Sequence, residues 1–190
     1  MCGRYTLTDE DDNMDLKFIL DEIRKHYPER PLKLGEIFPT DTAPIVIAGE
    51  NGWEGTPAVW GLPLGQKKEV VINARAETAI EKRMFRESLL TRRCVIPATG
   101  FFEWSQGERK QKYLFRLPDA SLLYMGGLFE SVDDQIRFVI LTTQANASVE
   151  EIHKRMPVIF HRRLAEEWMT TRQPLEILKN EMPYLVRQTA

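Results

Sequence analysis

The spacing of apolar residues along the chain predicts a small number of helices. Leu16, Ile19, Leu20 and Ile23 fall on one face of a helix expected over residues 14–26, with Asp and Asn residues before it as caps. Tyr27-Pro28 ends this helix. A second helix is expected after Thr78 and up to Leu90, with Met84, Phe85, Leu89 and Leu90 facing inward, and shorter ones over residues 149–155, 164–169 and 175–180.

The rest of the apolar pattern is typical of short strands. Strands are expected at residues 45–47, 56–60, 70–72, 94–97, 100–104, 112–117, 122–129 and 137–142. Gln106-Gly107-Glu108 and Asp133-Asp134 fit hairpin turns, and the proline-containing segment 31–44 is read as a loop. Many strands with irregularly placed helices predict an α+β fold: one domain over residues 1–190, with a curled, barrel-like mixed sheet and peripheral helices.

Composition restricts the classes of partner and of site. The net charge of −2 excludes a general basic field, so a polyanion must bind a local cluster of Lys and Arg. Candidates for a basic groove are Lys82, Arg83, Arg86, Arg92, Arg93, Lys154 and Arg155. Two cysteines make neither a disulfide framework nor a zinc site, and we expect no metal and no cofactor. Without a signal peptide or a membrane-length apolar run, the protein is expected in the cytoplasm or, in a eukaryote, the nucleus.

The second residue, Cys2, carries the most distinctive chemistry. If Met1 is removed, the chain begins with a cysteine that has both a free amine and a thiol. The amine of such a residue condenses with an aldehyde, and the sulfur then closes a five-membered ring. Neighbouring cations such as Arg4 are expected to lower the pKa values of both groups. The same position also suits an N-terminal nucleophile that attacks an amide.

Four further residues are candidates for the same site, and each also has a purely structural interpretation. Asn73 and Arg75 lie where a strand is expected to give way to a helix, so they either bind a ligand or cap that helix. Glu103 lies among aromatic residues, where burial would raise its pKa and suit it to proton transfer. His153 is expected on a short helix, where a single histidine is more often structural than catalytic.

Four blocks of sequence together resemble the SOS-response-associated peptidase family. They are Cys2-Gly3-Arg4-Tyr5, the segment 73–78 (Asn-Ala-Arg-Ala-Glu-Thr), the segment 93–104 (Arg-Cys-Val-Ile-Pro-Ala-Thr-Gly-Phe-Phe-Glu-Trp) and His153-Lys154-Arg155-Met156-Pro157. The resemblance implies one α+β domain with a positively charged cleft. It also implies covalent capture of abasic sites in single-stranded DNA, through a thiazolidine that Cys2 forms with the opened deoxyribose.

The resemblance also assigns roles to individual residues. Cys2 would be the nucleophile, Asn73 would position the sugar and the amine, Glu103 would move protons and His153 would assist Schiff-base chemistry. Four residues would bind the DNA: Arg4 and Arg75 at the phosphates, together with Trp60 and Pro39. The expected partner is single-stranded DNA with abasic sites, bound by a monomer with no membrane contact, and replication-fork proteins are further candidate partners.

Two positions depart from the family pattern. Glu36 lies three residues before Pro39, where family members usually have Asn. The segment Trp60-Gly61-Leu62-Pro63-Leu64-Gly65 lacks the second aromatic residue that often follows it in the family. That aromatic residue helps to separate DNA strands, so these departures concern the choice of DNA structure and not the chemistry of Cys2.

Two other functions compete with this hypothesis. The first is a peptidase or N-terminal nucleophile amidohydrolase, possible if Cys2 attacks an amide, including the bond to its own leading Met. The second is a non-enzymatic module that binds single-stranded nucleic acid through Trp60, Phe102, Trp104 and the basic groups.

Overall fold

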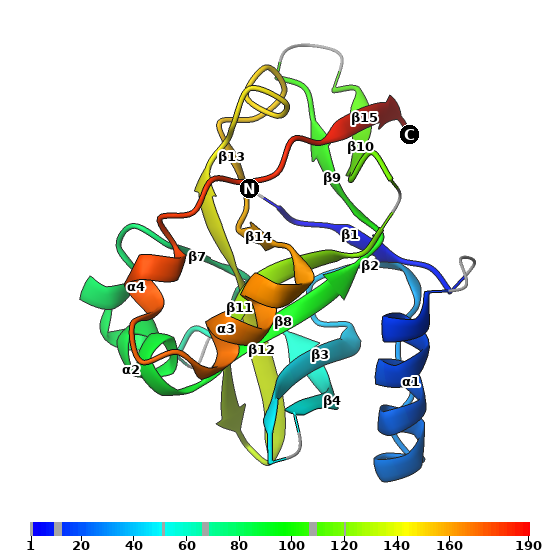
Figure 1. Ribbon diagram of the computed structural model, residues 1–190, viewed down its shortest axis with the longest axis vertical. Coiled ribbons are helices and arrows are strands. Elements are labelled where there is room, and N and C mark those ends of the chain that lie inside the picture. Colours follow the sequence, from blue (N-terminus) through cyan, green and yellow to red (C-terminus); the bar gives the residue numbers. More distant parts are fainter. Residues whose placement is uncertain (1, 10–12, 51, 66–68, 107–109, 120) are drawn as a thin grey trace.

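A closed five-stranded barrel forms the centre of the protein, seen here in a computed structural model that describes residues 2–9, 13–50, 52–65, 69–106, 110–119 and 121–190 (Figure 1). Its strands are β3 (Thr42–Gly49), β4 (Gly52–Trp60), β12 (Gln135–Gln144), β11 (Leu123–Val132) and β8 (Arg93–Ala98). They pair in that order, and β8 returns to β3. The barrel is mixed because β12 and β4 run parallel while the other pairs are antiparallel.

A second sheet stands at one end of the barrel, at the top of Figure 1. Its strands, in spatial order, are β15 (Val186–Thr189), β10 (Lys112–Arg116), β9 (Gly100–Trp104), β1 (Tyr5–Leu7) and β2 (Gly35–Ile37). Short strands complete the framework: β7 (Asn73–Arg75) and β13 (Arg155–Pro157) on β12, β14 (Ile159–Phe160) on β11, and the pair β5 (Leu62–Pro63) and β6 (Val70–Val71). The predicted single α+β domain with a barrel-like mixed sheet is therefore the observed fold class.

The helices pack around the barrel. They are α1 (Met14–His26), the 3₁₀ turn η1 (Ala79–Glu81), α2 (Arg83–Thr91), α3 (Arg162–Thr170) and α4 (Pro174–Ile177). The first has the bounds and the buried face predicted from the sequence, and the Asn13 side chain caps it by accepting from the Leu16 N–H at 3.0 Å. It packs closely on β4, where a Cβ on Gly55 would lie 2.7 Å from the carbonyl oxygen of Ile19. None of the helices in the described ranges is both long and apolar enough to span a bilayer.

Several sequence predictions are wrong in detail. Residues 149–152 form hydrogen-bonded turns instead of a helix, because the Asn146 side chain takes up the Ser148 N–H and the chain must then join β12 as β13. His153 therefore lies at the end of a turn. Leu90 is exposed, since α2 buries the face that carries Phe85 and Leu89.

The shortest strands were not predicted. These are β1, β2, β5, β7, β13, β14 and β15, each of two to four residues. The predicted turn at Asp133-Asp134 is confirmed, with φ of 49° and 58° at its two residues, as a tight β11–β12 hairpin requires. At Gln106-Gly107-Glu108 the last two residues lie outside the described ranges, but the flanking strands β9 and β10 do pair.

Arg93 was predicted in a basic groove, and this is wrong because its side chain is buried. Its guanidinium donates to five carbonyl oxygens at the ends of α2 and α3, those of Leu89, Leu90, Trp168, Met169 and Thr171. The last carbonyls of a helix have no partner within that helix. Arg93 therefore ties both helices to β8 and places its positive charge at the negative ends of their dipoles.

We predict that Arg93→Met lowers the free energy of unfolding by about 3 kcal/mol, because it leaves buried carbonyl groups without donors. Urea denaturation measures the change. The matched control is Arg92→Met: Arg92 is the next residue and pairs with Glu87 and Glu130 at the surface, so this change should cost less than about 1 kcal/mol. Equal losses for the two variants would contradict the structural role of Arg93.

Candidate functional site

Cys2 is held at the junction between the five-stranded sheet and the barrel. It precedes β1, which lies between β2 and β9, and its side chain is buried. The Nδ2 of Asn73 donates to the Cys2 carbonyl at 2.8 Å, and the Cys2 thiol lies 3.7 Å from the Arg4 carbonyl oxygen. Asn73 is fixed in turn because β7 pairs with β12, where it lies opposite Ile140. Asn73 thus contacts the candidate nucleophile directly and does not cap a helix.

Glu103 and His153 lie on the same side of this junction. Glu103 is on β9 and is 4% exposed, and its Oε1 lies 3.9 Å from the Nδ1 of His153. The His153 ring is oriented by the Arg155 backbone, whose N–H lies 3.0 Å from Nδ1. Burial raises the pKa of Glu103, and the nearby charge of protonated His153 opposes that effect. His153 is thus partly exposed beside a carboxyl group that is buried.

The thiol of Cys2 has a raised pKa in this structure. The main cause is burial, and the negative charge of nearby Glu103 acts in the same direction. The expectation that a neighbouring cation lowers this pKa is therefore wrong for the thiol, because the Arg4 guanidinium reaches away toward Glu36. A neutral thiol must lose its proton as it reacts, and Glu103 is close enough for its charge to affect that step.

Arg4 is clamped between aromatic rings. Its Cζ lies 4.2 Å from the centre of the Phe38 ring and 5.0 Å from that of Trp104. Its Nη1 also forms an ion pair with Glu36 at 3.2 Å. Arg4 therefore carries a fixed positive charge two residues after Cys2 in the chain, and this charge is already paired with a carboxylate.

The other residues predicted to bind DNA differ in accessibility. Arg75, on β7, is exposed, and Pro39 is half-buried in a turn next to Thr40, whose φ is 76°. Trp60 is fully buried: it lies edge-on against Tyr5, stacks on Phe138 and donates to the Ile72 carbonyl. The prediction that Trp60 contacts DNA does not fit this position, because neither face of its ring is open to a base.

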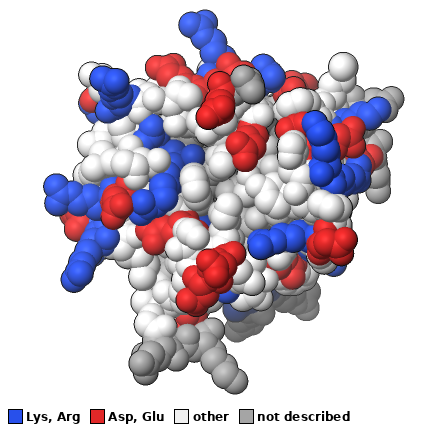
Figure 2. All heavy atoms as spheres, turned by 90° about the horizontal axis from the view of Figure 1, so that it is seen from below, with Lys and Arg blue, Asp and Glu red and all other residues white. Residues whose placement is uncertain are grey.

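Acidic partners neutralise two cations of the predicted basic groove, while Lys82, Arg83, Arg86 and Lys154 are exposed. Arg155 makes a two-pronged ion pair with Glu77, at 2.8 and 2.9 Å, and Arg92 pairs with Glu87 and Glu130. In Figure 2, which views the molecule from below, Lys and Arg side chains stand among Asp and Glu on that face. A polyanion therefore has to bind locally, where individual cations are presented.

A cavity of about 300 Å³ adjoins the candidate site. It is lined by Gln106, Glu150, Glu151, Ile152, His153 and Lys154, so His153 lies between this cavity and Glu103.

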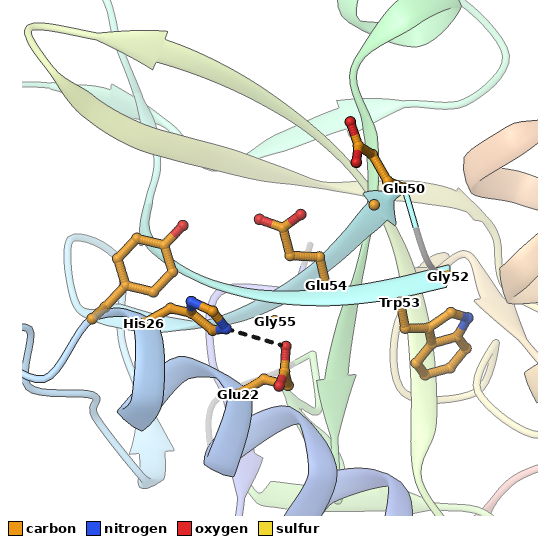
Figure 3. A pocket seen from close by; sticks show the side chains of 9 residues that line it. Glu22, His26, Glu50, Gly52, Trp53, Glu54 and Gly55 are labelled. Carbon is orange, nitrogen blue, oxygen red and sulfur yellow. Dashed lines mark ion pairs between the residues drawn. The ribbon is translucent and has the colours of Figure 1, made fainter.

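A larger cavity of about 570 Å³ lies elsewhere, between the end of α1 and the β3–β4 hairpin (Figure 3). Three glutamates, Glu22, Glu50 and Glu54, line it. Their charge is unfavourable for a polyanion. Within the described ranges, no group of three His, Cys, Asp or Glu residues is arranged to hold a metal ion.

The sequence analysis missed the role of Lys112 beside this site. Its Nζ lies 2.5 Å from the Oε1 of Glu36 and 3.9 Å from the centre of the Phe102 ring. The strand alternation that placed Lys112 at the start of a strand gave no indication of its partners, because Glu36 is 76 residues away in the chain. Glu36 itself was noticed only as a departure from the family pattern.

Comparison with known proteins identifies the family of this chain. The family model described as SOS response associated peptidase (SRAP) matches residues 1–188. The chain belongs to this family. Its relatives include the abasic site processing protein YoqW of Bacillus subtilis, which is 37% identical, with 89% of this chain and 80% of the relative covered. Another is the abasic site processing protein YedK of Escherichia coli, which is 29% identical, with 89% and 79% covered.

Solved structures agree with the fold. A protein from Bacteroides thetaiotaomicron has a TM-score of 0.78 at 21% identity, with 99% of this chain and 91% of that chain covered. One from Bordetella bronchiseptica has a TM-score of 0.79 at 20% identity, with 100% and 99% covered. The fold is thus shared by proteins of very different sequence.

We predict that Glu103→Gln stabilises the protein relative to wild type as the pH rises. A carboxyl group whose pKa is raised by folding stabilises the fold at low pH. This stabilisation begins to fall when the pH exceeds the group's ordinary pKa of 4.5, and it is lost once the pH has passed the raised pKa. Glutamine cannot titrate and loses nothing. Urea unfolding of both proteins from pH 4 to pH 8 should show a difference that grows with pH; a constant difference would contradict the burial effect.

Proposed function

We propose that this protein captures abasic sites in single-stranded DNA covalently through Cys2. The observation that carries the proposal is the convergence of Cys2, Asn73, Glu103 and His153 at one junction, within a few residues of the Arg4 cation. An abasic deoxyribose opens to an aldehyde, which is the group that an N-terminal cysteine converts into a ring. The names of the relatives YoqW and YedK, which both describe abasic site processing, support this substrate.

The reaction proceeds in two steps once Met1 has been removed. The Cys2 amine adds to the aldehyde carbon and water leaves, which gives an imine. The Cys2 sulfur then bonds to the imine carbon, the thiol proton departs and the imine nitrogen gains a proton, which closes the thiazolidine. No oxidant or reductant is consumed: both amine protons leave with the aldehyde oxygen as water in the first step, and the thiol proton ends on the nitrogen in the second.

The described side chains are placed to serve these steps. Glu103 accepts the thiol proton and supplies protons to the opening sugar, a dual role that its raised pKa favours at neutral pH. His153 acts beside it in forming and reversing the imine. The Asn73 amide holds the Cys2 carbonyl through Nδ2, and its buried Oδ1, which accepts no hydrogen bond from a described group, receives one from the amine or from a sugar hydroxyl.

The DNA backbone is held by cations at the edge of the site. Arg4 and exposed Arg75 bind phosphates, and the half-buried turn at Pro39 contacts the strand beside them. The protein acts as a monomer, with the strand as its partner. Because Arg4 is already paired with Glu36 and the net charge of the chain is −2, this non-covalent binding is weak, and the covalent bond retains the protein at the lesion.

We predict that Cys2→Ala abolishes the stable adduct, as does any residue left in front of Cys2, because ring closure needs both the amine and the thiol. The measurement is the intact mass of the protein after mixing with an abasic single-stranded oligonucleotide, which reports Met1 removal and adduct formation together. Cys94→Ala is the matched control, since Cys94 is a second buried thiol on the barrel strand β8, and it should retain capture.

Three results would replace this function with another. A full adduct yield from a protein verified to carry a tag before Cys2 would exclude the thiazolidine. Amide cleavage that depends on Cys2, without an adduct, would favour the peptidase function. Binding of DNA with no mass change in wild type would leave a single-stranded DNA-binding module.

We predict that Glu103→Gln slows cross-linking about a hundredfold while DNA binding changes little, because proton transfer by a positioned side chain contributes at least that much. Single-turnover cross-linking from pH 5 to pH 9 measures the rate, and the variant should lose the inflection that the titration of Glu103 gives to wild type. His153→Ala should mainly impair interconversion through the imine. Wild-type rates for Glu103→Gln at every pH would make Glu103 a structural residue.

A further inference from the structure

Two cations and one carboxylate form a compact cluster on the sheet into which Cys2 leads. Glu36 accepts from Arg4 through Oε2 at 3.2 Å and from Lys112 through Oε1 at 2.5 Å. The three residues come from distant parts of the chain and meet because β2, β1, β9 and β10 are neighbours in one sheet. In the register of that sheet Glu36 lies opposite Thr6, and Lys112 lies opposite Trp104.

The two cations are held in place without Glu36. Arg4 is packed between the rings of Phe38 and Trp104, and Lys112 lies over the ring of Phe102. Cation–π contacts of this kind orient the charges even when their ion pairs break. The hydrogen bond from Lys112, with the charges of both cations, lowers the pKa of Glu36, so its carboxylate is charged at neutral pH.

We propose that Glu36 is an internal competitor for the DNA backbone: its carboxylate occupies the anion position between Arg4 and Lys112, and a phosphate binds there only by displacing it. The inference rests on the proposed function and adds a determinant of specificity. Glu36 is 38% exposed, so its side chain has room to turn toward water. Ion pairs this exposed are weak, and a phosphate diester can replace the carboxylate as a singly charged anion.

The consequence is discrimination between damaged and undamaged strands. Every strand that binds the cluster bears the cost of displacing Glu36. An undamaged strand has only its phosphate contacts to offset that cost, so it dissociates. An abasic strand reaches Cys2 and forms a covalent bond. That bond retains the strand even though the free energy of displacing Glu36 has weakened its non-covalent binding. Glu36 therefore lowers affinity for ordinary single strands without preventing capture.

The test measures equilibrium binding of an oligothymidylate that contains no abasic site, across a range of salt concentrations. Four variants are compared with wild type: Glu36→Gln, Lys112→Gln, the double variant and Glu50→Gln. The last is the matched control, since it removes one carboxylate charge from the separate cavity of Figure 3. Circular dichroism and urea unfolding verify that each variant is folded.

We predict that Glu36→Gln binds the oligonucleotide roughly two- to tenfold more tightly at low salt. The slope of log affinity against log salt should become steeper by about 0.7, because the cluster gains one net positive charge. Glu50→Gln should change affinity by less than about twofold, since long-range charge effects are screened. Lys112→Gln should weaken binding more in the Glu36→Gln background than in wild type, because Lys112 is free only there.

Two results would overturn the proposal. The first is a gain for Glu36→Gln no larger than that for Glu50→Gln, which would leave only a general charge effect. The second is an additive effect of Glu36→Gln and Lys112→Gln, which would show that the two residues do not share one anion position. Failure of the proposed function is a separate observation: wild type would form no adduct with an abasic oligonucleotide, whatever its binding of oligothymidylate.

Discussion

The hydrogen bond from Asn73 to the Cys2 carbonyl joins the start of the chain to the barrel. On one side, Asn73 is fixed by the pairing of β7 with β12. On the other, Cys2 leads into β1, whose three residues are all buried between β2 and β9. The backbone at Cys2 is thus restrained by a side chain and a strand, and a chain start would otherwise fray. Because Cys2 is fixed, Glu103 and His153 have a constant position relative to its reacting atoms.

Burial controls the protonation of the two reactive side chains at this site, the Cys2 thiol and the Glu103 carboxyl group. The same low-dielectric surroundings raise the pKa of the Cys2 thiol and that of Glu103. The charge of an ionised Glu103 further disfavours a thiolate beside it, so the thiol keeps its proton until the sulfur attacks. In the proposed reaction the carboxylate of Glu103 then accepts that proton. This arrangement favours nucleophilic attack coupled to proton transfer over a permanently ionised cysteine.

The sequence predicted what depends on local pattern and missed what depends on pairing across the chain. The helix α1 has its apolar period and its Asn13 cap within fifteen residues, so its bounds were correct. The strand β1 has three residues and exists only because β2 and β9 flank it. Trp60 illustrates the same limit, since an aromatic residue in a family motif could equally bind a base or fill the core. Cys2, Asn73, Glu103 and His153 were found by motif, but their common junction required the fold.

Several cations near the site form ion pairs with carboxylates that are distant in the sequence and are brought close by the fold. The chain has 26 basic and 28 acidic residues, and the cations around the site are matched individually: Arg4 and Lys112 with Glu36, and Arg155 with Glu77. A phosphate reaches these paired cations only by replacing their carboxylate partners, and such exposed pairs are weak enough for this exchange to occur at short range. For the covalent capture proposed above, exchange of this kind is sufficient, because the encounter complex needs to last only as long as the chemistry at Cys2.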